Sequence, residues 1–511
     1  MIPEVLCFYG LKWTSGIYKT LLKWYNSCVW YFAETDHIML GGIIYMFSKL
    51  RNKESRAMVG IIMSLAWPTI VEQIMQTAVQ YIDTAMVGSL GTQATAAVGA
   101  TSTVGWLLFS SISACSIGFL SFIAKACGAN DKPAAQKAVS QAVLVTLILG
   151  TVFTIFPVAL SGMVPVWMQV DENIRELAST YFLILYLPML PRTASTIFGT
   201  VLRAAGDTKT PMKSGVLVNI INIVLNFLLI YPTRTISIFS LNLTLPGAGW
   251  GVVGAAVASA IAFTVGGIQI TVALWKHPMV SPRGMSLKPD MTILKPCLKI
   301  AVPNMLQRFG SSLGYVAFAA MINSMGEVAT AAHTIANTVE SAFYIPGYGM
   351  QTAAATLAGN AYGAQDNKRM KKLAAMFIPI EIFLMIFSGG ALFLSAPTLM
   401  RLFSSSDAVI MLGATVLRMV AVSEPFYGFS IIIEGLMMGV GKTKEPFVFN
   451  IIGMWLVRVG GTFLCTQFLG MGLIAAWACM IAHNLLVFVL YLITYIRGSW
   501  NPLHEKKKAT A

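Results

Sequence analysis

The stretch Ala94-Thr95-Ala96-Ala97 returns 235 residues later as Ala329-Thr330-Ala331-Ala332. The same offset, without a gap, aligns the whole region 66–131 with the region 301–366. A self-match of this length is hard to obtain by chance. It indicates that the chain contains two copies of one structural unit.

The repeat extends beyond this region. At the same offset, the turn at residues 206–211 falls on residues 441–446. Gly249-Trp250-Gly251 matches Gly470-Met471-Gly472 after a shortening of the second copy. Both copies are strongly apolar, and two apolar repeats that face each other are a recurring plan among secondary transporters.

Composition places the chain in a membrane. Its 511 residues are 56% hydrophobic and only 11% charged, with a mean hydropathy of +0.71. A soluble domain carries about 25% charged residues, so this chain has too little polar surface to be soluble. The apolar runs are continuous rather than alternating, which argues against a transmembrane β-barrel.

The apolar runs predict twelve membrane-spanning helices, because each approaches or exceeds the roughly 20 residues that cross a bilayer. They lie at about 58–87, 95–124, 135–160, 175–200, 211–232, 250–275, 297–324, 330–358, 371–395, 409–437, 446–468 and 471–496. Six fall in each copy. The predicted fold is therefore an all-α polytopic membrane protein with two pseudo-symmetric six-helix lobes. Pro188 and Pro425 interrupt the fourth and tenth runs.

We expect five segments along the chain. They are an N-terminal extension (1–56), an N-lobe (57–275), a cytoplasmic inter-lobe linker (276–296), a C-lobe (297–497) and a basic cytoplasmic tail (498–511). The extension mixes aromatic residues with lysine, which suits a membrane interface; an interfacial segment and a disordered one both remain open. The gap 233–248 is the longest external loop that we expect.

The positive charge follows the topology. The net charge is +14, and Lys and Arg concentrate in the even-numbered gaps between the runs and in the tail. Under the positive-inside rule these gaps and both termini are cytoplasmic. This explanation of the charge makes a nucleic-acid partner unnecessary. Six helices per copy give both lobes the same orientation, with a central cavity between them. We expect a bacterial inner membrane as the location.

The sequence contains no recognisable catalytic or metal-binding motif. The seven cysteines are scattered, without metal-ligand spacing or a disulfide framework. The turn at 206–211 lacks the spacing of a phosphate-binding loop. We therefore expect no enzyme activity, no catalytic residue, no metal site and no bound cofactor.

The acid Asp83 lies in the second half of the first predicted span. An ionisable group inside a span is costly and usually faces a cavity or a partner. Asp83 can exchange a proton or bind a cation; a structural hydrogen bond between helices is the alternative. On the fifth span, Asn219, Asn222 and Asn226 share one helix face. Their amides can contact Asp83 or a cation, or simply join helices.

The second copy distributes its acids differently, because Asp83 corresponds to Phe318. Four acids lie in its spans instead: Glu340, Glu381, Glu424 and Glu434. A second coupling carboxylate and a site for a cationic substrate are the functional interpretations. Ion pairing with Arg418 or Arg458 is the structural alternative.

Several polar residues are candidates for lining the central cavity. Glu72 and Gln73 in the first span match Gln307 and Arg308 in the seventh at the repeat offset. We expect six residues to face the substrate: Glu72, Gln73, Gln307, Glu340, Glu424 and Glu434.

The chain resembles the multidrug and toxic-compound extrusion (MATE) family over about residues 58–497. The resemblance rests on Pro68, residues 83–88, Gly128-Ala129, residues 202–209, the asparagines of span five, and second-copy echoes at 331–333, 363–364 and 439–441. It implies twelve helices in two lobes and export of organic, often cationic, compounds in exchange for protons or sodium ions.

The resemblance also implies site residues. In bacterial members the acid of span one and polar groups of span five form the cation site of the N-lobe, which here are Asp83, Asn222 and Asn226. Many members have Asp where this chain has Asn226, which weakens the case for a sodium site. Members of a second branch carry an acid on span seven, where this chain has Ser311 and its neighbours. Glu340 and Glu434 are our hypothetical substitutes for it.

We therefore expect an antiporter that exports small, drug-like organic cations in exchange for H+ or Na+ by alternating access of its lobes. We expect it to act as a monomer, with membrane lipid and a small organic solute as its partners. A flippase for lipid-linked precursors is the alternative within transport. A membrane-embedded enzyme or receptor is the alternative from another class.

Overall fold

The computed structural model describes residues 53–168, 170–238 and 241–504. The chain divides into two units, Met1–Ala57 and Met58–Ala511, and the helices below belong to the second apart from the first residues of α3. Most of the predicted N-terminal extension and the end of the predicted tail lie outside the described residues.

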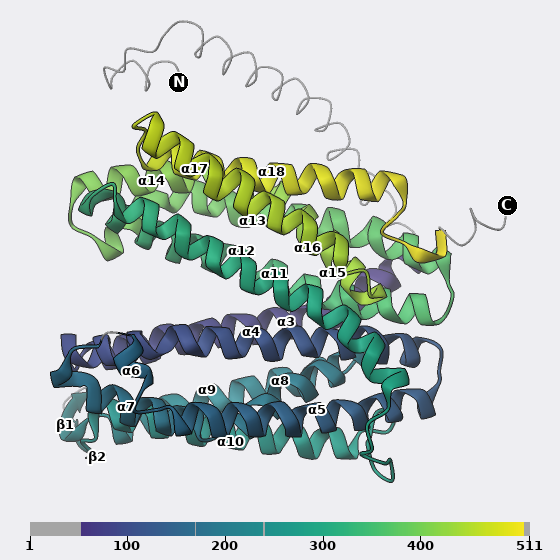
Figure 1. Cartoon of the computed structure of the whole chain (residues 1–511), viewed down its shortest axis with the longest axis horizontal. Helices are drawn as coiled ribbons and strands as arrows, with labels where there is room; N and C mark the ends of the chain where they lie inside the picture. The colour runs from purple at the N-terminus through teal and green to yellow at the C-terminus, as the bar shows by residue number, and fades with distance from the viewer. Residues whose placement is uncertain (1–52, 169, 239–240, 505–511) are drawn as a thin grey trace, which may run out of the picture. The chain divides into compact units, whose positions relative to one another are not determined.

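The N-lobe contains the following elements. They are α3 (Lys53–Gly88), α4 (Thr92–Gly128), α5 (Lys132–Ala159), α6 (Val164–Trp167), α7 (Glu172–Tyr186), α8 (Met189–Ala204), α9 (Lys209–Leu229), β1 (Pro232–Ile238), β2 (Leu241–Ala248) and α10 (Gly251–Lys276). Figure 1 shows α3 to α10 together in one bundle.

The C-lobe follows after an irregular connection. It contains α11 (Met291–Asn323), α12 (Glu327–Gly363), α13 (Asn367–Phe403), α14 (Asp407–Ala421), α15 (Glu424–Val440), α16 (Lys444–Ile451), η1 (Ile452–Gly460), α17 (Gly461–Phe463), η2 (Leu464–Phe468) and α18 (Leu473–Arg497). The η segments are π-helical and continue α16 as a single rod.

The fold is an all-α polytopic membrane protein. Eight described helices, counting α16 to η2 as one, are long and apolar enough to span a bilayer. Two bent pairs, α7–α8 at 47° and α14–α15 at 52°, qualify when each pair is taken as one span. Their breaks fall beside Pro188 and Pro425, as the sequence predicts. The remaining rods, α11 and α12, have 33 and 37 residues and carry more polar side chains.

The two copies share their turns as well as their helices. Gly91 and Gly326 precede α4 and α12 with φ of 111° and 100°. Asn130 and Gln365, also 235 residues apart, both adopt the left-handed region, with φ of 56° and 52°. That conformation is uncommon for a residue with a side chain, so its recurrence confirms the repeat at the level of the backbone.

The predicted external loop is an antiparallel hairpin. Strands β1 and β2 pair with a register that joins Thr235 to Thr244 and Ile236 to Leu243. The segment is rich in β-branched residues, which favour extended backbone. This short stretch lies between two long apolar runs, and the sequence predicted a loop there without strands.

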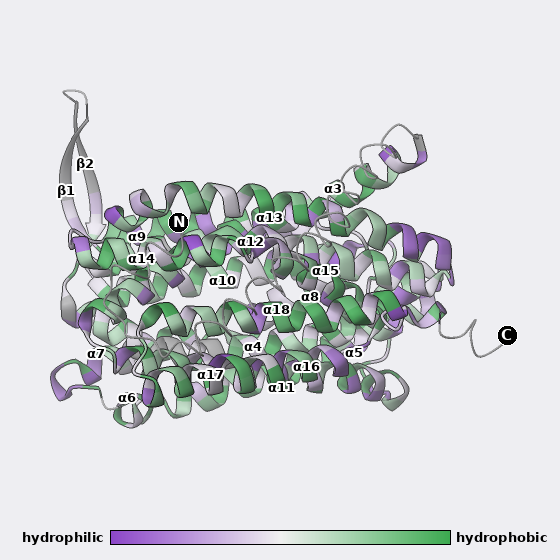
Figure 2. Cartoon of the chain, turned by 90° about the horizontal axis from the view of Figure 1, so that it is seen from above, coloured by the Kyte–Doolittle hydropathy of each residue, from purple (hydrophilic) through white to green (hydrophobic). Residues whose placement is uncertain are grey.

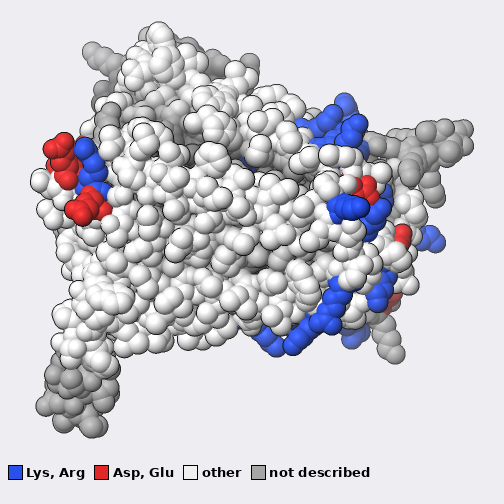
Figure 3. Space-filling model, turned by 60° about the horizontal axis from the view of Figure 1, so that its bottom comes forward, with Lys and Arg blue, Asp and Glu red and all other residues white. Residues whose placement is uncertain are grey.

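The surface of the second unit is apolar along the helices and charged at their ends. Large hydrophobic side chains face outward, for example Phe387 at 71% and Leu394 at 80% exposure, and Figure 2 shows apolar colour along most of the helix length. Figure 3 shows Lys and Arg gathered at one end of the molecule. We call this the basic end; it carries the even-numbered gaps of the sequence.

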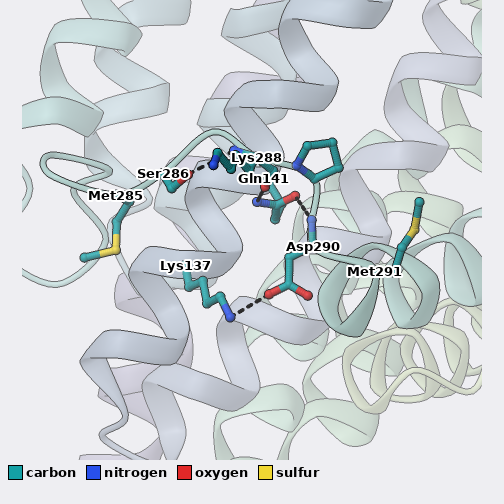
Figure 4. Close-up of a pocket in the computed structure, with 8 residues that line it drawn as sticks. Lys137, Gln141, Met285, Ser286, Lys288, Asp290 and Met291 are labelled. Carbon is teal, nitrogen blue, oxygen red and sulfur yellow. Dashed lines mark hydrogen bonds and ion pairs between the residues drawn. The ribbon is translucent and has the colours of Figure 1, made fainter.

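The start of α11 packs with the N-lobe. Ile293, Leu294 and Cys297 belong to the same core cluster as residues of α4, α5, α8 and α10. Figure 4 shows the anchor just before it: the buried side-chain amide of Gln141 on α5 donates to the carbonyl of Lys288 at 2.9 Å and accepts from the amide of Asp290 at 2.9 Å.

Lys137 on α5 also forms an ion pair with Asp290. The Asp290 carboxylate accepts further hydrogen bonds from Thr292, and these contacts, with the Lys137 bond the strongest, lower the pKa of Asp290 from 3.8 to about 2. The connection between the lobes is thus fixed to the N-lobe at its far end (Figure 4).

The lobes meet through glycine backbones near the basic end. A Cβ on Gly363 of α12 would collide with the carbonyl of Lys125 on α4, and one on Gly128 would collide with the carbonyl of Asn360. The Ser121 hydroxyl donates to the carbonyl of Gly439 at 2.9 Å. Such backbone approach is possible only without side chains. We call this set of contacts between α4 and helices α12 and α15 the glycine seam.

Candidate functional site

The polar site of the N-lobe is built from three helices. Asp83 lies near the end of α3, away from the basic end, and Asn222 and Asn226 lie one turn apart on α9. Ser259 enters from α10, which packs along α9. Asn226 is fully buried and Asn222 is 2% exposed, whereas Asp83 is half-buried. Sequence analysis brought the first three together and missed Ser259, whose run of small residues gives no sign of a polar role.

These side chains form one continuous hydrogen-bonded chain. The Asn226 amide Nδ2 donates to Asp83 Oδ1 at 2.5 Å and to Asn222 Oδ1 at 3.1 Å. The Asn222 Nδ2 donates to Ser259 Oγ at 3.0 Å. The remaining oxygen, Asn226 Oδ1, is buried without a partner among the described residues. One ionisable group thus sits at the end of a chain whose amides can rotate.

Asn219, the third asparagine of this helix face, is 8% exposed on α9. No hydrogen bond of its side chain to Asp83 is present in the described structure. It lies two turns from Asn226 toward the basic end and is not part of the chain.

Glu72 is held by an arginine of its own lobe. Arg203 Nη1 contacts both carboxylate oxygens of Glu72, at 2.8 and 2.9 Å, and Arg203 Nη2 donates to Thr200 at 2.8 Å. The two charged side chains are 11% and 15% exposed. This pair ties α3 to α8, so Glu72 is occupied by a partner within the N-lobe; its neighbour Gln73 is half-buried on α3.

In the C-lobe, two of the predicted cavity residues contact each other. Gln307 on α11 donates to Glu434 Oε1 on α15 at 2.8 Å. The next residue, Arg308, donates to Asn304 at 3.1 Å. In the same lobe, the hydroxyls of Tyr348 and Tyr427 are 2.9 Å apart. Glu72, the repeat partner of Gln307, also contacts the fourth span of its own lobe, but there the partner is Arg203, so the two lobes differ in the charges that meet.

Three further acids lie inside the C-lobe. Glu340 on α12, Glu381 on α13 and Glu424 at the start of α15 are 7%, 0% and 2% exposed. Glu381 packs into notches left by Gly347 and Gly428. None of the three forms an ion pair with Arg418 or Arg458 within 4.0 Å in the described structure. The described residues also contain no group of three or more His, Cys, Asp or Glu arranged for a metal ion.

Two repeated helical lobes, each crossing the membrane several times, with a half-buried acid on the first span, define a secondary transporter. A sequence model of the MatE family matches residues 68–228 and 303–464, and the two matches begin at the repeat-related prolines. Because they cover more than half of the chain, the chain belongs to the MatE family of transporters; it is not an enzyme.

Named relatives agree with this assignment. The chain is 25% identical over 439 residues to the probable multidrug resistance protein NorM of Thermotoga maritima, covering 86% of this chain and 92% of that protein. It is 25% identical over 451 residues to the probable multidrug resistance protein YoeA of Bacillus subtilis, covering 87% and 93%. The chain is thus a multi-pass membrane transporter of the multidrug efflux type.

Solved structures show the same fold. A MOP superfamily transporter from Pyrococcus furiosus superposes with a TM-score of 0.76 at 25% identity, over 86% of this chain and 95% of the other. A multidrug resistance MATE transporter in an outward-facing conformation gives a TM-score of 0.78 at 24% identity, over 87% and 96%. The arrangement of two lobes is therefore that of MATE transporters.

Proposed function

We propose that the chain is a secondary active antiporter that exports small organic cations in exchange for protons. It resides in a bacterial inner membrane as a monomer with both termini in the cytoplasm. The observation that carries the proposal is the hydrogen bond between Asp83 and Asn226, at the end of the buried chain that continues to Asn222 and Ser259.

A proton on Asp83 can reverse this chain. As a carboxylate, Asp83 accepts from the Asn226 amide. As a carboxylic acid it becomes a donor, and the oxygen of Asn226 is the acceptor without a partner. Rotation of both amides then lets Ser259 donate to Asn222, Asn222 to Asn226 and Asp83 to Asn226. Every link keeps a hydrogen bond, while each changes direction.

Because the chain joins α3, α9 and α10, its direction affects how these helices pack. We infer that proton binding favours one packing and proton release the other, which is the requirement for coupling. A sodium site would need several oxygen ligands around one ion. A proton needs only the single carboxylate of Asp83, and the neutral Asn226 beside it adds no second negative charge, which favours the proton.

The cargo is inferred from the C-lobe. Gln307 and Glu434 present a carboxylate that is hydrogen-bonded and half-buried. An organic cation gains from such a partner because its own desolvation is compensated. With the basic end in the cytoplasm, the glycine seam closes the cytoplasmic side, which supports an outward-facing state for this structure. Rocking of the two lobes about this seam would provide alternating access.

The test is ethidium efflux from proteoliposomes under an imposed proton gradient, and separately under a sodium gradient. We expect the proton gradient alone to drive efflux. Asp83→Asn should reduce efflux to the rate of protein-free liposomes, because the variant cannot carry the proton. The matched control is Asp131→Asn, an exposed N-cap acid that accepts from the amide of Ala134, since Asn caps helices as well.

Two results would contradict the proposal. Gradient-driven efflux by Asp83→Asn at the wild-type rate would exclude Asp83 as the coupling acid. If neither gradient moves ethidium, the cargo class is wrong. In that case the flippase alternative is tested by transfer of a fluorescent lipid between the leaflets of the same vesicles.

A further inference from the structure

The C-lobe position that corresponds to the Asp83 site contains the opposite charge. The offset of 235 takes Asp83 to Phe318, and the offset of 221 set by the later glycine match takes Ser259 to Met480. In the C-lobe, Arg458 of η1 lies in contact with both of these residues. The two pseudo-symmetric sites therefore differ by an acid in one lobe and a guanidinium in the other.

Arg458 is buried and forms no ion pair with a described acid. It is 3% exposed, and its Cζ lies 4.4 Å from the ring centre of Phe318 and 4.5 Å from that of Tyr315. Its Nη2 lies 2.8 Å from the sulfur of Met480, and its Nε has no hydrogen-bond partner among the described residues. Ring faces and a thioether are weak acceptors and carry no net charge. A guanidinium inside a span needs a stronger partner.

The groups around Arg458 can donate hydrogen bonds but lack acceptors. His333 packs between Phe318 and Trp477, with ring centres 5.6 and 5.9 Å apart. His483 packs against Gly453 on the same rod as Arg458. In the described structure, His333 Nδ1, His483 Nδ1 and Trp477 Nε1 are all buried without a partner. Buried polar atoms are nearly always paired, and with the imidazole protons on Nδ1 these three nitrogens offer N–H donors to an acceptor-rich group.

The repeat comparison shows that this set is specific to the C-lobe. His333, Trp477 and His483 stand where the first copy has Val98, Ala256 and Ala262. Each of these three donors in the second copy therefore corresponds to an apolar side chain in the first copy. The second copy thus has donors on two helices, α12 and α18, where the first copy has apolar residues.

Glu340 is the acid that competes for this role. It lies within electrostatic reach of Arg458 but forms no ion pair with it within 4.0 Å in the described structure. Glu340 is itself near Glu424, another buried acid. Within 4.0 Å, the Arg458 guanidinium therefore has no carboxylate partner among the described residues.

We propose that Arg458, His333, His483 and Trp477 form a binding site in the C-lobe for a small monovalent anionic group, either a halide ion or a carboxylate. One guanidinium provides one fixed positive charge, so a single negative charge matches it. Guanidinium and N–H donors around an apolar rim suit a compact, weakly hydrated anion. If the bound carboxylate is part of the exported solute, that assignment rests on the proposed function. The binding of an anion at Arg458 does not.

The experiment is a calorimetric titration of the purified full-length protein in a gluconate buffer. The probes are sodium chloride and sodium benzoate, which separate a free halide from a carboxylate. We expect saturable binding of at least one of them. Arg458→Gln should weaken it roughly ten- to hundredfold, since a charge-assisted hydrogen bond is lost.

The matched control is Arg418→Gln. Arg418 lies in the same lobe and also over an aromatic ring, Phe393 at 5.6 Å, but is exposed, so this variant should bind like the wild type. Arg458→Lys, which keeps a charge without the planar fork, should bind with intermediate affinity. This second variant keeps the test valid if Arg458→Gln does not fold.

Three outcomes would overturn the inference. The first is a wild type that shows no saturable binding of either anion. The second is an Arg458→Gln variant that binds as tightly as the wild type. The third is rescue: Arg458→Gln lowers the melting temperature and the double variant with Glu340→Gln restores it, which identifies Glu340 as the partner. None of these results depends on ethidium transport, so the two proposals can fail separately.

Discussion

Adding one methyl group to the glycine seam should open the basic end of the transporter. In Gly363→Ala the new Cβ would lie 2.7 Å from the carbonyl carbon of Lys125 and 3.0 Å from the amide nitrogen of Ala129. Ordinary contact begins near 3.4 Å. Both neighbours are backbone atoms of the opposite lobe, so no side chain can rotate away. The lobes must separate, or α4 must shift as a whole.

The size of the effect follows from the cost of overpacking. Forcing an extra methyl into a packed contact costs about 1–3 kcal/mol. The extra methyl group destabilises the state in which the glycine seam is closed, and it has no such effect on the state in which the seam is open. A difference of 1–3 kcal/mol changes the ratio of two states by about 5- to 150-fold. We expect a large shift away from the closed seam, with the protein still folded.

The assay is the distance between spin labels on Lys132→Cys and Lys368→Cys in a background free of other cysteines. Both positions are exposed in first turns, of α5 and α13, and they lie beside the seam in opposite lobes. Gly363→Ala should move the distance distribution to longer values. The control is Gly390→Ala, a helical glycine with open space where the Cβ would lie. Distributions for Gly363→Ala and wild type that superpose would refute this reasoning.

Three further predictions concern single side chains. Asn226→Asp adds a second carboxylate beside Asp83, and paired carboxylate oxygens favour a bound cation. Sodium at about 10 mM should therefore slow proton-driven efflux by the variant but not by the wild type; equal inhibition of both would contradict this. Glu72→Gln leaves Arg203 buried without its partner and should destabilise the protein by about 3 kcal/mol, measured by unfolding in denaturant, whereas Glu172→Gln, at a side chain 88% exposed, should have little effect. Because the pKa of Asp290 is lowered to about 2, its stabilising contribution is present above its unfolded value of 3.8 and is lost as pH falls toward 2; melting curves of wild type and Asp290→Asn should therefore converge near pH 2, and a constant gap from pH 6 to pH 2 would exclude this.

Local periodicity and the repeat predicted most of the helical framework. Residues with unusual backbone conformation, such as Asn130 and Gln365, recur at the offset read from the sequence. The bends at Pro188 and Pro425 follow from the missing N–H of proline. These features depend on residues close in sequence, or on equivalence between copies, and both can be read without knowing which helices touch.

Contacts across the bundle could not be read in this way. Ser259 joins the Asn222 amide across 37 residues, and Glu72 finds Arg203 across 131. Helical spacing shows which face a residue occupies, but not which helix covers that face. The Asp83–Asn226 contact was foreseen only because an acid in one span and an amide face in another are both costly to leave unpaired.

The connection between the lobes is a rigid link and not a flexible linker. Since Gln141 holds the chain at Asp290 and the first turns of α11 pack with the N-lobe, the two repeats are joined mechanically within α11, beyond the point where their sequences meet. Pro296 and Pro303 lie in this stretch, where each removes a backbone hydrogen bond that bending would otherwise strain. Lengthening the exposed loop at Gly284 should then leave the relative movement of the two lobes unchanged, whereas shortening the helix between Pro296 and Pro303 should change it.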